Sequence, residues 1–164
     1  MKPKILWIED GAFVDVQNLT GPVYVSGKYD LVVALDASEG FRQLRHTEFD
    51  SIVVDIRISP GDDPKWKDLY TEFGMNKASA RLGLHFLYSL LAPKDENTKV
   101  KLRNIPKWIT PNRFGILTVE SEMELQDDLR KLNIQVFRQK TAEMIETALL
   151  VTIEEILSKR KAQM

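Results

Sequence analysis

A small set of acidic and basic residues follows short apolar segments at widely separated points of the sequence. The set comprises Glu9, Asp10, Asp55, Thr118 and Lys140. Carboxylates that lie close together repel one another unless a cation neutralises them. One lysine does not balance three acids, whereas a hard divalent cation with oxygen ligands does, and Mg²⁺ commonly binds carboxylates together with waters and phosphate oxygens. If these groups meet, they favour phosphoryl transfer onto a carboxylate.

Each member of this set has a chemical part in such a transfer. Asp55 is the natural phosphoryl acceptor, because it follows a segment that we expect in the middle of a sheet. Lys140 can form an ion pair with the phosphoryl oxygens, and the hydroxyl of Thr118 can donate a hydrogen bond to one of them. Glu9 and Asp10 would hold the cation.

The elements that must position these residues alternate along the chain. The apolar segments cover residues 5–8, 31–34, 51–54, 114–117 and 134–137, and they are typical of strands buried on both faces. Helical apolar spacing lies between them, over 38–44, 82–91, 123–132 and 145–156. This order predicts an α/β fold with a five-stranded, doubly wound parallel sheet. Ligands bind beyond the carboxyl ends of such strands, which is where the set lies.

Some local signals refine this picture. Asp36 or Ser38 is expected to cap the second helix. Gly21, Pro22 and Gly27 predict a short first helix, with residues 23–25 extended.

Two segments are longer than ordinary connections in α/β units and are interpreted as insertions on either side of the third helix. They cover about residues 59–80 and 93–113, within a single domain that spans 1–164. Within the first insertion, helical spacing predicts a short amphipathic helix, more readily a small satellite core than a binding surface. Its apolar residues are Trp66, Leu69, Tyr70 and Phe73.

Composition limits the classes of function. The 164 residues carry a formal net charge of −1 with a pI of about 6.2, which argues against a nucleic-acid partner. There is no cysteine, so thiolate chemistry is excluded. The apolar run after Met1 is too short for a signal peptide or a membrane helix, and the expected location is the cytoplasm, without membrane contact.

The chain resembles a receiver domain of the two-component response-regulator family, with its CheY-like variant of the flavodoxin-like fold. Five segments in family order carry the resemblance, and all but the last end at or near a member of the set. They are Ile5-Leu6-Trp7-Ile8-Glu9-Asp10, Ile52-Val53-Val54-Asp55, Ile116-Leu117-Thr118-Val119-Glu120-Ser121, Val136-Phe137-Arg138-Gln139-Lys140 and Gly83-Leu84-His85-Phe86-Leu87.

The resemblance implies a phosphoacceptor signalling domain rather than an enzyme. Mg²⁺ would bind Asp10 and Asp55 directly, Glu9 through water, and the backbone carbonyl of Arg57. A histidine kinase or phosphotransfer protein would supply the phosphoryl group. Phosphorylation would draw Thr118 inward and let Phe137 turn, which alters the surface that binds a downstream protein. A second copy of the chain is a further candidate partner.

The sequence departs from the family pattern at three places. Gly11 stands where a third acid is frequent, and Thr141 follows Lys140 where a proline, often after a cis bond, is usual. A trans bond at Thr141 would leave the position of Lys140 open. The third departure is the first insertion, which leaves the sheet beside the predicted site and could cover it, slow water attack there or dock a partner.

Two alternatives to a phosphorylated receiver remain. The first is a degenerate receiver that keeps the fold and acts as a phosphorylation-independent interaction module. The second is a haloacid-dehalogenase-like phosphatase, which also uses an aspartate nucleophile beside Mg²⁺. That class needs Asp-x-Asp after its first strand, and Asp10 is followed by Gly11 and Ala12, so it ranks far lower. No output module is expected after the last helix.

Overall fold

The computed structural model describes residues 1–11 and 13–164, with the side chains of residues 13–16 left out. Its centre is a five-stranded sheet whose paired strands are all parallel, in the order β2-β1-β3-β4-β5. The strands are β1 (Lys4–Ile8), β2 (Asp30–Ala34), β3 (Ser51–Val54), β4 (Phe114–Thr118) and β5 (Val136–Gln139). The doubly wound parallel sheet that the sequence predicts is confirmed.

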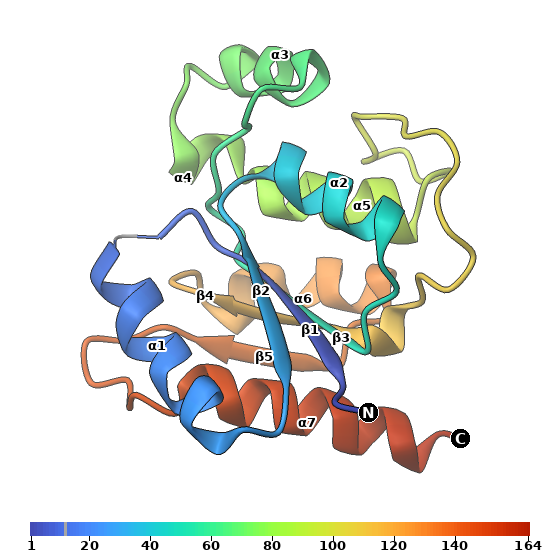
Figure 1. The fold of residues 1–164 in the computed structure, drawn as a ribbon. Coiled ribbons are helices and arrows are strands. Elements are labelled where there is room, and N and C mark those ends of the chain that lie inside the picture. Colours follow the sequence, from blue (N-terminus) through green and yellow to red (C-terminus); the bar gives the residue numbers. More distant parts are fainter. Residues whose placement is uncertain (12) are drawn as a thin grey trace.

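Helices cover both faces of the sheet (Figure 1). One face carries α1 (Phe13–Ser26) and α7 (Ala148–Ala162), and the other carries α2 (Ala37–His46), α5 (Leu82–Leu91) and α6 (Glu122–Leu132). Two core clusters correspond to these faces, because alternate residues of a strand point to opposite sides. Leu6 and Ile8 of β1 belong to the cluster under α2, α5 and α6, whereas Ile5 and Trp7 belong to the one under α1 and α7.

The second helix begins as predicted, and the first does not end as predicted. The side chain of Asp36 caps α2 by accepting a hydrogen bond from the backbone N–H of Glu39 at 2.7 Å. The prediction of a short first helix with residues 23–25 extended is wrong, because α1 continues through Pro22 to Ser26. Burial of Leu19 and Val23 in the core against α7 outweighs the missing hydrogen bond of the proline.

Two other boundaries differ from the sequence pattern. β5 begins at Val136 rather than at residue 134, because the preceding helix ends in a left-handed residue, Asn133, with φ 56°. The backbone N–H of Ile134 then donates to Leu129 of α6, which uses that amide before the strand starts. The last helix begins at Ala148, and Ile145, which the helical pattern included, is exposed ahead of it.

The first insertion contains the predicted amphipathic helix and one further turn. These are α3 (Pro64–Glu72) and α4 (Lys77–Ala80). Trp66 and Leu69 are buried in the same core cluster as α2 and α5, so α3 extends the main core. Phe73 lies just past α3 and stacks on His85, with 5.7 Å between the ring centroids.

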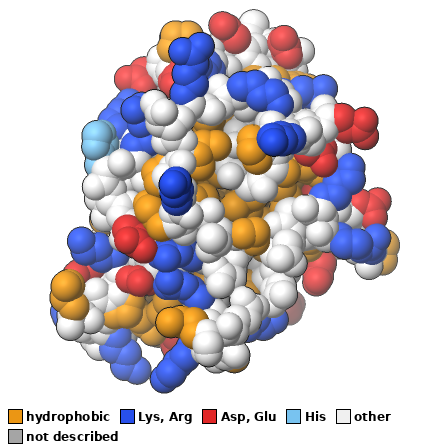
Figure 2. All heavy atoms as spheres, turned by 90° about the vertical axis from the view of Figure 1, so that its right-hand side faces the viewer, with side chains coloured by type: hydrophobic (Ala, Val, Ile, Leu, Met, Phe, Trp, Pro, Cys, Tyr) orange, Lys and Arg blue, Asp and Glu red, His pale blue; other side chains and the backbone are white. Residues whose placement is uncertain are grey.

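The second insertion, residues 93–113, has no helix before the 3-10 turn η1 (Pro111–Arg113). It runs along the side of the molecule where α5 ends and returns to the start of β4 (Figure 1). From this segment, Trp108 and Ile109 pack against the core cluster under α2, α5 and α6. Figure 2 shows that side, with hydrophobic side chains gathered in the middle among basic ones. Within the part of the chain that the structure describes, no helix is long and apolar enough to cross a membrane.

Candidate functional site

Backbone hydrogen bonds continue the sheet by one residue past the ends of β1, β3 and β5, and so fix where Glu9, Asp55 and Lys140 lie. The N–H of Glu9 donates to Ala34 at 2.9 Å, and the N–H of Asp55 donates to Ile8 at 3.0 Å. The N–H of Lys140 donates to Thr118 at 2.6 Å. The set predicted from the sequence therefore lies along the carboxyl edge of the sheet, as the parallel topology requires.

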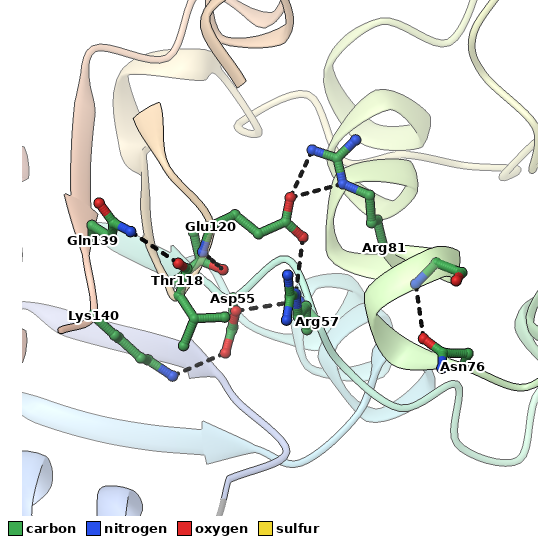
Figure 3. Close-up of polar contacts among 10 residues, drawn as sticks. Asp55, Arg57, Asn76, Arg81, Thr118, Glu120, Gln139 and Lys140 are labelled. Carbon is green, nitrogen blue, oxygen red and sulfur yellow. Dashed lines mark hydrogen bonds and ion pairs between the residues drawn. The ribbon is translucent and has the colours of Figure 1, made fainter. Parts of the chain in front are cut away.

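Lys140 joins two of the predicted acids in a buried ion cluster. Its Nζ lies 2.9 Å from Oδ2 of Asp55 (Figure 3). The same Nζ also contacts Oε2 of Glu9. The exposed fractions are 9% for Lys140, 4% for Asp55 and 3% for Glu9. The peptide bond before Thr141 is trans. The open question about Lys140 is thus answered, since a trans loop still brings its ammonium to the carboxylate of Asp55.

Burial and the neighbouring charges together shift the pKa values of Glu9 and Lys140. Burial, and then the charge of Asp55, raise the pKa of Glu9 to about 8 even with Lys140 beside it. Burial alone would lower the pKa of Lys140, but the charges of Asp55 and Glu9 outweigh it and raise that pKa. Two buried carboxylates share one ammonium, so a further cation would stabilise the ionised form of Glu9.

Away from Lys140, Asp55 contacts the backbone of Arg57 and the start of α5. Its Oδ1 accepts the backbone N–H of Arg57 at 3.2 Å. The start of α5 packs directly on its backbone, and the N–H of Gly83 donates to Ile56 at 2.9 Å. A Cβ atom at Gly83 would lie 1.9 Å from the carbonyl oxygen of Asp55. Glycine is therefore required at this position for α5 to approach the backbone of Asp55.

Asp10 makes different contacts from the other two acids. Its Oδ2 accepts a hydrogen bond from the hydroxyl of Ser59 at 2.7 Å and pairs with Nζ of Lys77 at 2.5 Å. Both partners come from the first insertion. Neither was predicted, because the sequence gives no sign that a lysine of an inserted turn folds back onto the end of β1.

A third buried acid, Glu120, links the end of β4 to the start of α5. Its Oε2 accepts from Nε of Arg57 at 3.2 Å, and its Oε1 accepts from Nε of Arg81 at 2.9 Å (Figure 3). Glu120 is 4% exposed, so the two arginines supply the charge that its burial requires. Its position two residues after Thr118 was the only signal in the sequence that it would lie near the site.

Thr118 and Phe137 lie where the sequence places them. Thr118 is fully buried at the end of β4, and its Oγ1 accepts the N–H of Glu120 at 3.5 Å. Phe137 is half-buried in β5 and packs against the core cluster under α2, α5 and α6. Nearby, Nε2 of Gln139 donates to the carbonyl of Val119 at 3.1 Å. The switching movements of Thr118 and Phe137 stay predictions.

The donors at this edge suit a hard cation in chemistry, because Glu9, Asp10 and Asp55 offer only carboxylate oxygens. In the described part of the chain, however, no three acidic or histidine side chains converge as metal ligands. Two lysines take the place of a cation instead, with Lys140 on Glu9 and Asp55, and Lys77 on Asp10. Binding of Mg²⁺ by these acids and the carbonyl of Arg57 stays a prediction.

No family model matches the chain, and no curated protein matches it. Solved structures do match it. A CheY-like response regulator receiver domain protein of Methanospirillum hungatei JF-1 has a TM-score of 0.62 at 14% identity and covers 100% of both chains. The receiver domain of the Francisella response regulator 1452 has a TM-score of 0.59 at 19% identity, covering 97% of this chain and 99% of that one.

A third similar structure is the chemotaxis response regulator CheY4 of Vibrio cholerae. Its TM-score is 0.58 at 15% identity, and the match covers 96% of this chain and 100% of that one. The chain therefore has the CheY-like receiver fold over essentially its whole length. Identities this low establish the fold alone, and a function must be argued from the site.

Proposed function

On the premise of this fold, we propose that the chain is a response-regulator receiver domain that accepts a phosphoryl group on Asp55. One observation carries the proposal. In a receiver fold, the ammonium of Lys140 bridges the buried carboxylates of Glu9 and Asp55 at the carboxyl edge of the sheet. The donor would be the phosphohistidine of a histidine kinase or phosphotransfer protein, and the phosphorylated form would bind a downstream protein.

The residues of the site can carry out this transfer. A carboxylate oxygen of Asp55 attacks the phosphorus, the bond from phosphorus to the donor nitrogen breaks, and the leaving imidazole takes up a proton. Lys140 already contacts the attacking carboxylate and pairs with the transferred phosphoryl oxygens. Thr118 can turn its hydroxyl toward the same oxygens. Glu9, Asp10, Asp55 and the carbonyl of Arg57 would hold Mg²⁺, which when bound neutralises the charge that gathers on the phosphoryl group.

Phosphorylation would be read on the surface of α6, β5 and α7. Thr118 ends β4, and Phe137 is half-buried in the neighbouring strand β5. Inward movement of Thr118 would open space for Phe137, and the exposed residues around it would shift with it.

The test is phosphorylation by a small donor such as acetyl phosphate. We expect Mg²⁺-dependent, hydroxylamine-labile labelling, seen by intact mass, that Asp55→Asn abolishes. The matched control is Asp62→Asn, an acid of the first insertion whose side chain is 81% exposed, and it should label like the wild type. Labelling that persists in Asp55→Asn, or no labelling of the wild type, would refute the proposal.

A second candidate is the phosphorylation-independent interaction module. The ion pair between Lys77 and Asp10 favours it, because a lysine of this chain already occupies the carboxylate that would bind the cation. Under this alternative, Asp55→Ala leaves partner binding unchanged, while deletion of residues 62–75 abolishes it. Loss of partner binding in Asp55→Asn with the insertion intact would decide for the phosphorylated receiver.

A further inference from the structure

Lys77 is brought to Asp10 by a short turn with a defined shape. Gly74 and Met75 have positive φ values of 71° and 57°, and they reverse the chain after α3. The side chain of Asn76 then caps α4 by accepting the N–H of Ser79 at 3.0 Å (Figure 3). The first residue of α4 is Lys77, whose Nζ forms an ion pair with Oδ2 of Asp10 at 2.5 Å.

Both ends of the segment that carries Lys77 are anchored. Before it, Trp66 and Leu69 are buried in the core. After it, Arg81 pairs with Glu120, with 2.8 Å between Nη2 and Oε1. The residues from 71 to 79 are exposed, although Phe73 among them stacks on His85 and Ala80 at the end of α4 is buried in the core. Lys77 is thus held near Asp10 by its neighbours while remaining able to leave.

The ion pair itself is not deeply buried. The side chain of Lys77 is 47% exposed and that of Asp10 is 10% exposed. Glu9 also acts on Lys77 through its charge, so the ammonium lies in the field of both acids of the pair. A half-exposed pair of this kind is weak, and a dication at the same carboxylates has the greater charge.

We propose that Lys77 is an internal competitor of the divalent cation at Asp10, so that cation binding requires Lys77 to leave and frees the α4 turn. The proposal rests on the proposed function, because it assumes that the acids of this site bind a cation. It gives the first insertion a role that the sequence left open: the insertion sets how tightly the cation binds.

The first measurement is direct binding of Mg²⁺ or Mn²⁺ by calorimetry, without any phosphodonor. Removing the competitor in Lys77→Met should tighten binding about five-fold, the equivalent of a weak ion pair. The matched control is Lys67→Met, which removes the same charge from an exposed position of α3 and should bind like the wild type. Lys77→Arg keeps the charge and should stay within a factor of about two of the wild type.

The second measurement follows Lys77 itself. An amine-selective reagent is applied with and without Mg²⁺, and the modification of Lys77 is compared with that of Lys67 in the same sample by mass spectrometry. Because the ammonium must leave Asp10 before it reacts, Mg²⁺ should increase the labelling of Lys77 relative to Lys67.

The possible outcomes separate this proposal from the proposed function. Equal cation affinity of the wild type, Lys77→Met and Lys67→Met overturns the competition and leaves phosphorylation of Asp55 standing. Weaker binding in Lys77→Met also overturns it, since Lys77 would then assist the cation. If no variant binds a cation but Asp55 is still labelled, the competition and the Mg²⁺ requirement both fail while the acceptor remains.

Discussion

Replacing Lys140 by methionine tests whether its ammonium balances the buried acids. The side chains of Lys140, Glu9 and Asp55 are 7%, 3% and 6% exposed, so water cannot replace the lost charge. Methionine keeps most of the apolar stem, which limits the change in packing. The substitution leaves two buried carboxylates with no counter-ion between them.

The expected loss is large. The two carboxylates contact the same ammonium nitrogen. Two unit charges about 4 Å apart repel by about 4 kcal/mol at an effective dielectric constant of 20. Loss of one partner from a buried ion pair costs about 3–5 kcal/mol in other proteins. We therefore expect Lys140→Met to lower the free energy of unfolding by about 3–5 kcal/mol at mildly alkaline pH. At mildly acidic pH the loss should shrink, because Glu9 takes up a proton.

Urea unfolding followed by tryptophan fluorescence measures this, since Trp7 and Trp66 are fully buried. The double variant Asp55→Asn with Lys140→Met should recover much of the lost stability, because one carboxylate then remains. The control is Lys159→Met, whose side chain is 46% exposed, and its effect should stay within about 0.5 kcal/mol. A loss below about 1 kcal/mol in Lys140→Met at every pH, or no recovery in the double variant, would refute the charge argument.

Three further predictions follow from the same structure. Gly83→Ala should lower the free energy of unfolding by more than about 2 kcal/mol in urea, because the added Cβ would overlap the carbonyl of Asp55. The control is Gly21→Ala in α1, where an added Cβ meets no other atom, and it should raise the free energy of unfolding by about 0.5–1 kcal/mol. The folded-state pKa of Glu9 is raised from 4.5 to about 8, so the free energy of unfolding should fall as pH rises through that window. Glu9→Gln should remove this part of the fall. Parallel pH profiles of the wild type and Glu9→Gln would contradict the raised pKa of Glu9. Trp66→Ala should cost about 3–5 kcal/mol on thermal or urea unfolding if α3 belongs to the core, and a loss near zero would show a detachable insertion.

The fold and the acidic edge could be predicted because one pattern determines both. An apolar run that stops at a carboxylate shows both a buried strand and the group at its end, and this held for Glu9 and Asp55. Lys140 was placed correctly by its position after β5, although the strand itself starts later than its apolar run. These features depend on local sequence together with the parallel topology.

The missed features depend on contacts between distant parts of the chain. Nothing in the sequence distinguishes a lysine in an exposed turn from any other surface lysine, so the pairing of Lys77 with Asp10 could not be predicted. The two arginines on Glu120 were missed for the same reason. The local preferences of Gly21, Pro22 and Gly27 favour a short first helix, whereas burial of Val23 against α7 decides the outcome.

The close fit of α5 against Asp55 restrains the backbone on one side of the site more than on the other. The backbone of Asp55 is bonded to β1 at its N–H and pressed by Gly83 at its carbonyl, so β3 has little room to yield when the side chain changes. On the opposite side, Val119 and Gln139 are exposed at the end of the β4–β5 pair. If Asp55 is phosphorylated as proposed, movement is therefore expected at the ends of β4 and β5 rather than in β3.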